Sequence, residues 1–181
     1  PGIFYSEYYA HILSGVSDYL YDTAYKFKML LLKNDSFQWD SFDFKAGENV
    51  DGLIIVHWFK FFSRKSVINR LKVPCVIIND VDKGIKALFI SADQYQGGRL
   101  AAEHLLLKGH RNIGVLSGPQ WSLDSRQRLA GFLEYCHEND VDIAGDHIVA
   151  ADYLENTAYE RVGRLLDADK KISAFFCCND Q

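Results

Sequence analysis

Apolar residues recur along this chain with two alternating spacings, one typical of helices and the other of buried strands. Stripes with apolar positions three or four residues apart predict helices at about 6–25, 63–72, 94–108, 123–139 and 156–169. Short apolar runs bounded by glycine, proline or asparagine predict strands at 26–33, 52–57, 75–79, 87–91, 113–116, 147–151 and 174–178. Strands that alternate with helices indicate βαβ units, so we expect an α/β fold with parallel sheets.

The stretch from Asp93 to Asp124 carries the densest set of local signals. Asp93 is suited to cap a helix, and the paired glycines Gly97 and Gly98 lack a Cβ, so another backbone can come close to them. Gly109 stands where a glycine commonly ends a helix. This stretch therefore predicts a helix, a short buried strand and a loop that leads into the next helix.

The same stretch contains a family pattern. Its order D-x-x-x-G-G-x-x-A-x-x-H-L-x-x-x-G-H-R-x-I-G, followed by S-G-P and R-L-A-G-F, resembles the LacI family of bacterial repressors. The segments V-D-G-L-I-I, V-P-C-V-I-I-N and F-C-C-N-D-Q extend the resemblance over nearly the whole chain. The resemblance implies a domain like a periplasmic sugar-binding protein, with two Rossmann-like α/β lobes and a ligand cleft between them.

The resemblance also predicts how the chain divides. Residues 1–110 would form the N-terminal lobe without its first strand, and residues 111–181 part of the C-terminal lobe, each with its own sheet. The first crossing between the lobes would lie near Lys108 to Arg111. The family's helix-turn-helix would precede residue 1, so we expect a portion of a longer chain that is incomplete at both ends.

Composition narrows the class of protein. The 181 residues are 48% hydrophobic and 24% charged, which is ordinary for a globular protein. The net charge is −4 and basic residues form only isolated pairs, which argues against DNA binding by these residues themselves. No apolar run approaches the ~20 residues that span a bilayer. The four cysteines lack the spacing of a zinc site, so we expect buried free thiols in a reducing cytoplasm.

The candidate ligand site lies in the loops beyond the carboxyl ends of the strands, where open α/β sheets bind ligands. Arg128 stands early in a predicted helix, where the resemblance implies an arginine that hydrogen-bonds the effector; the plain alternative is a surface arginine. Its guanidinium offers five donors in a fixed fork, suited to sugar hydroxyls or a carboxylate. Asn179 and Asp180 follow the last strand, and the resemblance places such a pair at the cleft, although either could instead form a turn or a helix cap.

Further candidates share a place in these loops. An aromatic face packs on a sugar ring or a planar base, and small polar groups exchange hydrogen bonds with hydroxyls. Each aromatic residue could equally well lie in the core or on the surface without contacting a ligand. The remaining ligand-binding candidates are the aromatic residues Phe4, Tyr5, Trp58 and Tyr153 and the polar residues Ser122 and Asp124.

The sequence lacks the patterns of catalytic and metal-binding sites. His104 and His110 are separated by a helix stop and have no carboxylate cluster beside them, so we expect no metal site. The sequence has neither a G-x-S-x-G nucleophile motif nor a G-x-G-x-x-G dinucleotide motif. We therefore expect no catalytic residue and no cofactor.

Three functions stay open at this point. The first is the effector-sensing domain of a cytoplasmic, homodimeric LacI-type regulator. Such a domain would bind a small molecule, a sugar in preference to a purine, and control operator DNA through the helix-turn-helix, without a membrane partner. The second is a periplasmic sugar-binding protein of the same fold, and the third is a flavodoxin-like enzyme, because fold alone does not decide function. A signal peptide or a helix-turn-helix ahead of residue 1 would distinguish the first two.

Overall fold

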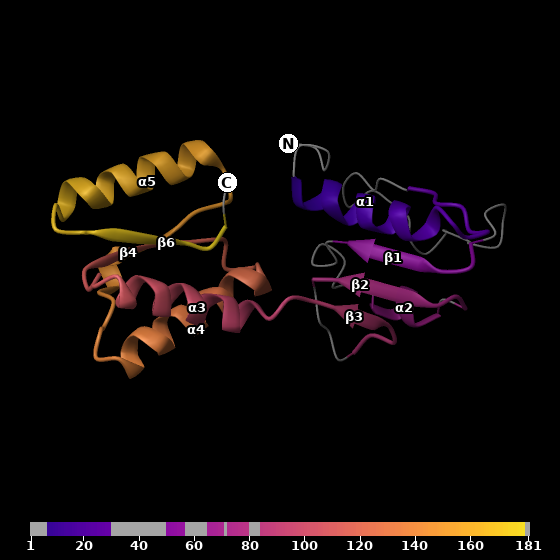
Figure 1. Ribbon diagram of the computed structural model, residues 1–181, viewed down its shortest axis with the longest axis horizontal. Coiled ribbons are helices and arrows are strands. Elements are labelled where there is room, and N and C mark those ends of the chain that lie inside the picture. The colour runs from indigo at the N-terminus through magenta and orange to yellow at the C-terminus, as the bar shows by residue number, and fades with distance from the viewer. Residues whose placement is uncertain (1–6, 30–49, 57–64, 71, 80–83, 180–181) are drawn as a thin grey trace. The chain divides into compact units, whose positions relative to one another are not determined.

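The computed structural model describes residues 7–29, 50–56, 65–70, 72–79 and 84–179 (Figure 1). The chain forms two compact units, residues 1–38 and residues 39–181. All the strands of the described residues are parallel and belong to two separate three-stranded sheets. The α/β class and the two sheets, one on each side of residue 110, are as the sequence predicted.

The first unit contains the helix α1 (Glu7–Leu20), which carries the predicted apolar stripe but buries none of its residues. The helix ends at Leu20, earlier than expected, because the backbone and hydroxyl of Thr23 both donate to the Leu20 carbonyl. The strand predicted at 26–33 is wrong for its described part: residues 26–29 are exposed and form no strand. Apolar residues alone do not make a strand when no neighbouring strand takes up their backbone hydrogen bonds.

The first sheet has the order β1 (Leu53–Val56), β2 (Cys75–Ile78) and β3 (Leu88–Ile90). The helix α2 (Lys65–Arg70) supplies Ile68 to a small core with Cys75, Ile77 and Ile85. Asn69 of α2 donates to the carbonyl of Gly84 and accepts from the backbone of Lys86, which holds the segment that leads into β3.

The second sheet has the order β5 (Ile148–Ala150), β4 (Ile113–Ser117) and β6 (Ala174–Cys177). Every residue of β4 is buried, as expected for a central strand covered on both faces. The helices α3 (Gln94–Leu107) and α4 (Leu123–Glu138) cover one face, and α5 (Glu155–Ala168) covers the other (Figure 1). A 3₁₀ turn, Gly145–His147, leads into β5.

The helices α3 and α4 cross in backbone contact through Gly98 and Gly131. A Cβ added at Gly98 would lie 2.0 Å from the carbonyl oxygen of Arg128, and one added at Gly131 would lie 2.0 Å from that of Tyr95. Only glycine permits this approach. The predicted cap is confirmed at the start of α3, where the Asp93 side chain accepts from the backbone of Gln96.

This crossing assigns α3 to the core of the second sheet. Ala102 and Leu106 of α3 lie in one buried cluster with Val115, Phe132 and Phe176, the last two stacked in parallel at 4.2 Å. The division expected at residue 110 placed α3 with the first sheet instead. The close approach expected at Gly97 and Gly98 is confirmed at Gly98 and wrong at Gly97, which has open space where a Cβ would lie. The sequence did not show which helix approaches Gly98.

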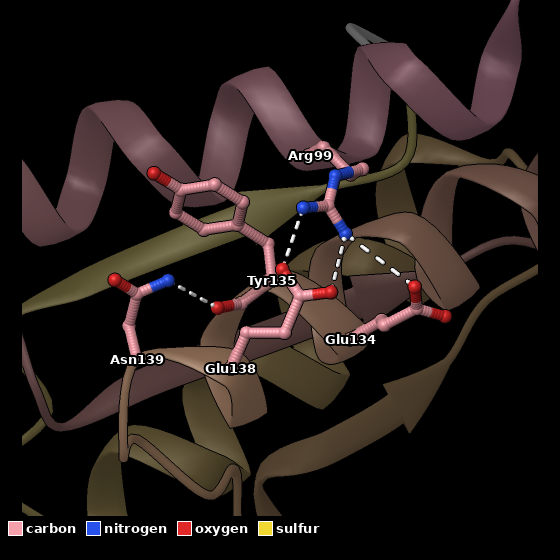
Figure 2. Close-up of polar contacts among 5 residues, drawn as sticks. All are labelled: Arg99, Glu134, Tyr135, Glu138 and Asn139. Atoms are coloured by element: carbon pink, nitrogen blue, oxygen red, sulfur yellow. Dashed lines mark hydrogen bonds and ion pairs between the residues drawn. The ribbon is translucent and has the colours of Figure 1, made fainter.

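An ion-pair network lies on the same α3–α4 contact (Figure 2). Arg99 of α3 donates to Glu134 at 3.4 Å and, with two nitrogens, to Glu138 of α4, and its guanidinium lies 5.1 Å from the Tyr135 ring. The hydrogen bond from Arg99 holds the pKa of Glu138 below its usual value. The network links α3 to α4 beside the glycine crossing, because Arg99 directly follows Gly98.

Asp169, just after α5, contacts one residue in each of the segments that lead into β4, β5 and β6. Its carboxylate accepts from the Asn112 amide at 3.0 Å and the Lys171 backbone at 2.8 Å, and lies 3.3 Å from Nε2 of His147. The hydrogen bonds from Asn112 and Lys171 lower the pKa of Asp169.

We expect Asp169→Ala to destabilise the protein at neutral pH and to lose this effect in acid. Because the native pKa of Asp169 is lowered, the carboxylate stabilises the fold above the ordinary aspartate pKa, and this stabilisation is lost as the pH falls through the native pKa. Urea unfolding of the wild type and Asp169→Ala over this pH range measures the difference. If the urea midpoints of the wild type and Asp169→Ala differ by the same amount at acid and at neutral pH, the titration of Asp169 is not linked to stability.

The four cysteines are free, as predicted, but not all are buried: Cys177 is exposed, whereas Cys75, Cys136 and Cys178 are buried. Burial raises the pKa of Cys75 and of Cys136 to about 11, so both are neutral thiols in the core. Adjacent residues of a strand point to opposite faces, which is why Cys177 and Cys178 differ. None of the helices within the described ranges is long and apolar enough to cross a membrane.

Candidate functional site

The carboxyl edge of the second sheet brings three loops together. The strands β4, β5 and β6 are parallel, so the residues that follow Ser117, Ala150 and Cys177 lie at one edge. Most described candidates from the sequence stand here, in the loop after β4, the loop after β5 and the residues after β6. The parallel sheet thus collects side chains that are up to about sixty positions apart in the chain.

Arg128 is held at this edge by two hydrogen bonds. Its Nε donates to Oε1 of Gln94 at 2.6 Å, and its Nη1 donates to the carbonyl oxygen of Cys178 just after β6. The side chain therefore connects the start of α3, the body of α4 and the end of β6. It is half-buried, and no carboxylate of the described residues pairs with it.

Gln94 is the site residue that sequence reasoning missed. It is only 7% exposed, which is rare for a polar side chain. Because the Nε–H of Arg128 can only donate, the Gln94 oxygen must face it and the amide nitrogen must point away. That nitrogen has no acceptor in the described part of the chain. In the sequence, Gln94 stands four residues before Gly98 and eight before Ala102, but only the structure shows that this face of α3 is buried.

Ser122 and Tyr153, two of the predicted residues, contact each other. The Tyr153 hydroxyl donates to Oγ of Ser122 at 2.9 Å, and the same oxygen caps α4 by accepting from the backbone of Ser125. Gly118 lies under the Tyr153 ring, because a Cβ added there would come within 2.4 Å of a ring carbon. Tyr153 has a φ of 66°, an unusual conformation for an aromatic residue, and such outliers concentrate at functional sites.

The loop between β4 and α4 is held from several sides. The backbone of Gly118 donates to Oγ of the buried Ser125 at 2.8 Å, and Ser122 donates back to the Pro119 carbonyl. The guanidinium of Arg126 donates to the Gln120 carbonyl, so this exposed arginine supports the loop. The loop is therefore preorganised around Trp121.

The other predicted residues divide into two groups. Asn179 follows β6 and Asp124 lies in the first turn of α4, and both are half-buried. His104 is exposed and His110 bonds to Ser173, and no cluster that could hold a metal ion occurs in the described ranges. Phe4, Tyr5, Trp58 and Asp180 lie outside the described residues.

Residues 44–181 match the family model of the periplasmic binding protein domain. The chain belongs to this family. Over 175 residues it is 27% identical to the HTH-type transcriptional repressor PurR of Mannheimia succiniciproducens, a match that covers 96% of this chain and 52% of the repressor. The chain thus spans about half the length of the curated relatives it matches.

Solved structures of transcriptional regulators share the fold of this chain. A LacI family transcription regulator from Clostridium acetobutylicum is 21% identical, with a TM-score of 0.74 over 93% of this chain and 62% of that one. The regulator CelR in complex with cellobiose is 24% identical, with a TM-score of 0.62 over 73% of this chain and 41% of that one. The resemblance to LacI-type regulators and the fold expected from it are both confirmed.

Proposed function

We propose that this chain is the effector-binding domain of a LacI-type transcriptional regulator, and that the effector binds at the carboxyl edge of the second sheet. The match to repressors along 96% of the chain supports a regulator over a periplasmic transport protein or an enzyme. The chain would act in the cytoplasm, and operator DNA would be contacted by a helix-turn-helix outside these residues.

The partners of Arg128 are the observation that supports a ligand site at this edge. A half-buried cation normally pairs with a carboxylate, yet Arg128 has only a neutral amide and a carbonyl as partners among the described residues. Its remaining N–H groups and the amide nitrogen of Gln94 are all donors. A bound molecule with several acceptor oxygens would satisfy them, and sugar hydroxyls or a carboxylate fit this requirement.

The mechanism is linkage between the ligand and DNA. An effector that binds one arrangement of the domain better than another shifts the population toward it, and typical coupling energies are about 1–3 kcal/mol. We favour a sugar over a purine as the effector, because the edge combines donors with aromatic side chains and a structural neighbour is a cellobiose complex.

A ligand screen tests the function. At a concentration roughly 100 times its Kd, a true effector stabilises the folded state by ~2.7 kcal/mol, which would raise the melting temperature by about 5–10 °C. Mono- and disaccharides, cellobiose among them, are compared with purine bases and nucleosides. A shift with a sugar supports the proposal in full, a shift with a purine corrects the effector class, and no shift with any compound contradicts the assignment.

Self-association is a separate prediction. The outer face of α3 exposes Leu100 and Leu107, the latter 80% accessible, and α1 ends beside the exposed Tyr19 and Tyr21. Large apolar side chains that are exposed on the surface in this way favour a protein–protein interface. We expect a homodimer by sedimentation velocity in the micromolar range, weakened by Leu100→Glu and Leu107→Glu. A monomer in the wild type would contradict this prediction.

A further inference from the structure

Three connecting segments meet at the amino edge of the second sheet, at the opposite end of the strands from the proposed effector site. Because β4, β5 and β6 are parallel, residues 108–112, 139–147 and 169–173 all lie at the end where α5 ends and β6 begins (Figure 1). The strand order β5-β4-β6 places residues 139–147 on one side of the central strand and residues 169–173 on the other. The amino edge is therefore a surface built from three parts of the chain.

Positive and negative charges are separated along the amino edge. Residues 139–147, which lead into β5, contain three aspartates and no lysine or arginine. Residues 108–112 and 169–173, which lead into β4 and β6, together contain three lysines, one arginine and one aspartate. That aspartate, Asp169, is occupied by its contacts with the Asn112 amide, the Lys171 backbone and His147. The edge is therefore acidic in front of β5 and basic in front of β4 and β6.

Most of these charges have no opposite charge beside them. Asp142 contacts His137, and Lys170 pairs with Asp167 of α5. The remaining charged side chains are exposed and form no ion pair with any described residue of the chain: Lys108, Arg111, Lys171, Asp140 and Asp146. Cations and anions that stay apart within one copy are free to attract the opposite charges of another molecule.

The backbone of the amino edge is held in place by hydrogen bonds. The backbone of Ser173 donates to the Asn112 carbonyl at 2.9 Å, which joins the two basic segments. The acidic segment is anchored to the end of α4, where the backbone of Val141 donates to the Cys136 carbonyl at 2.9 Å. A surface whose backbone is already ordered loses less conformational entropy when it binds a partner.

We infer that the amino edge of the second sheet binds the same edge of a second copy of this chain. A two-fold axis through the edge makes it self-complementary, because the basic segments of each copy then face the acidic segment of the other. Each exposed ion pair contributes little, so the contact is weak and sensitive to salt. The contact uses other residues than the apolar surface of α1 and α3, and it needs no effector, so it is independent of the proposed function.

Sedimentation velocity of the wild type at low and high salt tests this contact. We expect an association step in about 20 mM sodium chloride that disappears in about 500 mM, because salt screens exposed charges, whereas association through apolar side chains persists. Lys171→Glu and Asp146→Lys should each weaken the salt-sensitive step roughly tenfold, because a two-fold contact contains each substituted residue twice. Arg161→Glu is the matched control: it makes the same charge change as Lys171→Glu at an exposed position of α5 and should leave the step unchanged.

An equimolar mixture of Lys171→Glu and Asp146→Lys separates a specific contact from a general effect of net charge. In a mixed pair, the new acid in the basic segment of one variant faces the new base in the acidic segment of the other, and the opposite half of the contact keeps its original residues. We therefore expect the mixture to regain the association that each variant alone has lost. A variant that had simply misfolded would not recover on mixing.

Three results would overturn the inference. The first is a wild type without a salt-sensitive association step. The second is a step that persists in both variants or that the mixture fails to restore. The third is binding of a DNA duplex by the wild type in the same low salt, lost in Lys171→Glu and without self-association, which would assign the basic segments to nucleic acid instead.

Discussion

Replacing Gly131 with alanine is expected to lower the free energy of unfolding by about 3 kcal/mol, the upper range for overpacking a close-packed interior. The added Cβ would lie 2.0 Å from the Tyr95 carbonyl oxygen and 2.9 Å from its carbonyl carbon. These are backbone atoms, so no side-chain rotation relieves the clash, and α3 would have to move away from α4. Gly98→Ala should behave alike, because its Cβ meets the Arg128 carbonyl.

Gly97→Ala is the matched control for the crossing. Gly97 neighbours Gly98 in α3, but a Cβ there would meet no atom within 4 Å beyond its chain neighbours and the backbone of its own helix. Alanine in a helix is favoured over glycine by roughly 0.5–1 kcal/mol, so this variant should be as stable as the wild type or more so. Urea denaturation followed by circular dichroism compares the three variants. Similar midpoints for Gly131→Ala and Gly97→Ala would mean that the helices do not cross in backbone contact.

Replacing Arg128 with alanine is expected to weaken effector binding by roughly tenfold to a hundredfold, because a hydrogen bond from a charged donor contributes about 1.5–3 kcal/mol. The measurement is calorimetric titration with the compound that gives the largest melting shift in the screen. The hydrogen bonds of Arg128 to Gln94 and to the Cys178 carbonyl add a structural cost of about 1–3 kcal/mol, measured by urea unfolding.

Further variants of Arg128 and Gln94 separate the effect on ligand binding from the effect on stability. Arg128→Lys keeps the charge but loses the planar fork, so we expect it to recover only part of the affinity. Gln94→Glu keeps an acceptor for the Arg128 Nε and removes the amide donor, whereas Gln94→Leu removes both. If Arg128→Ala binds as tightly as the wild type, the carboxyl edge of the second sheet is not the effector site.

The sequence predicted the local features of the site. The motif around Arg128 and its place early in a helix predict a site residue, and the structure places it beside the end of β6. Ser122 and Tyr153 were chosen as members of separate loops, and their hydroxyl groups are in contact. Strand periodicity was enough to locate these loops, because ligand-binding loops of parallel sheets follow the carboxyl ends of the strands.

The sequence could not predict the contacts of Gln94 and Trp121. Gln94 accepts a hydrogen bond from a residue 34 positions later, and Trp121 contacts a ring in a different loop. Neither contact leaves a local pattern, because each depends on where two separate elements meet. Glutamine at the start of a helix is ordinary until the helix packing shows that it is buried.

The sequence by itself determined the alternation of helices and strands, the parallel sheets and the cap at Asp93. The alternation and the cap depend on interactions between neighbours in the chain, which periodicity and residue type record directly, and strands that alternate with helices favour parallel sheets. Only the tertiary structure decided that α3 belongs with the second sheet and that Gln94 orients Arg128. Burial and long-range hydrogen bonds arise from packing between distant segments, and many sequences with the same local pattern could pack differently.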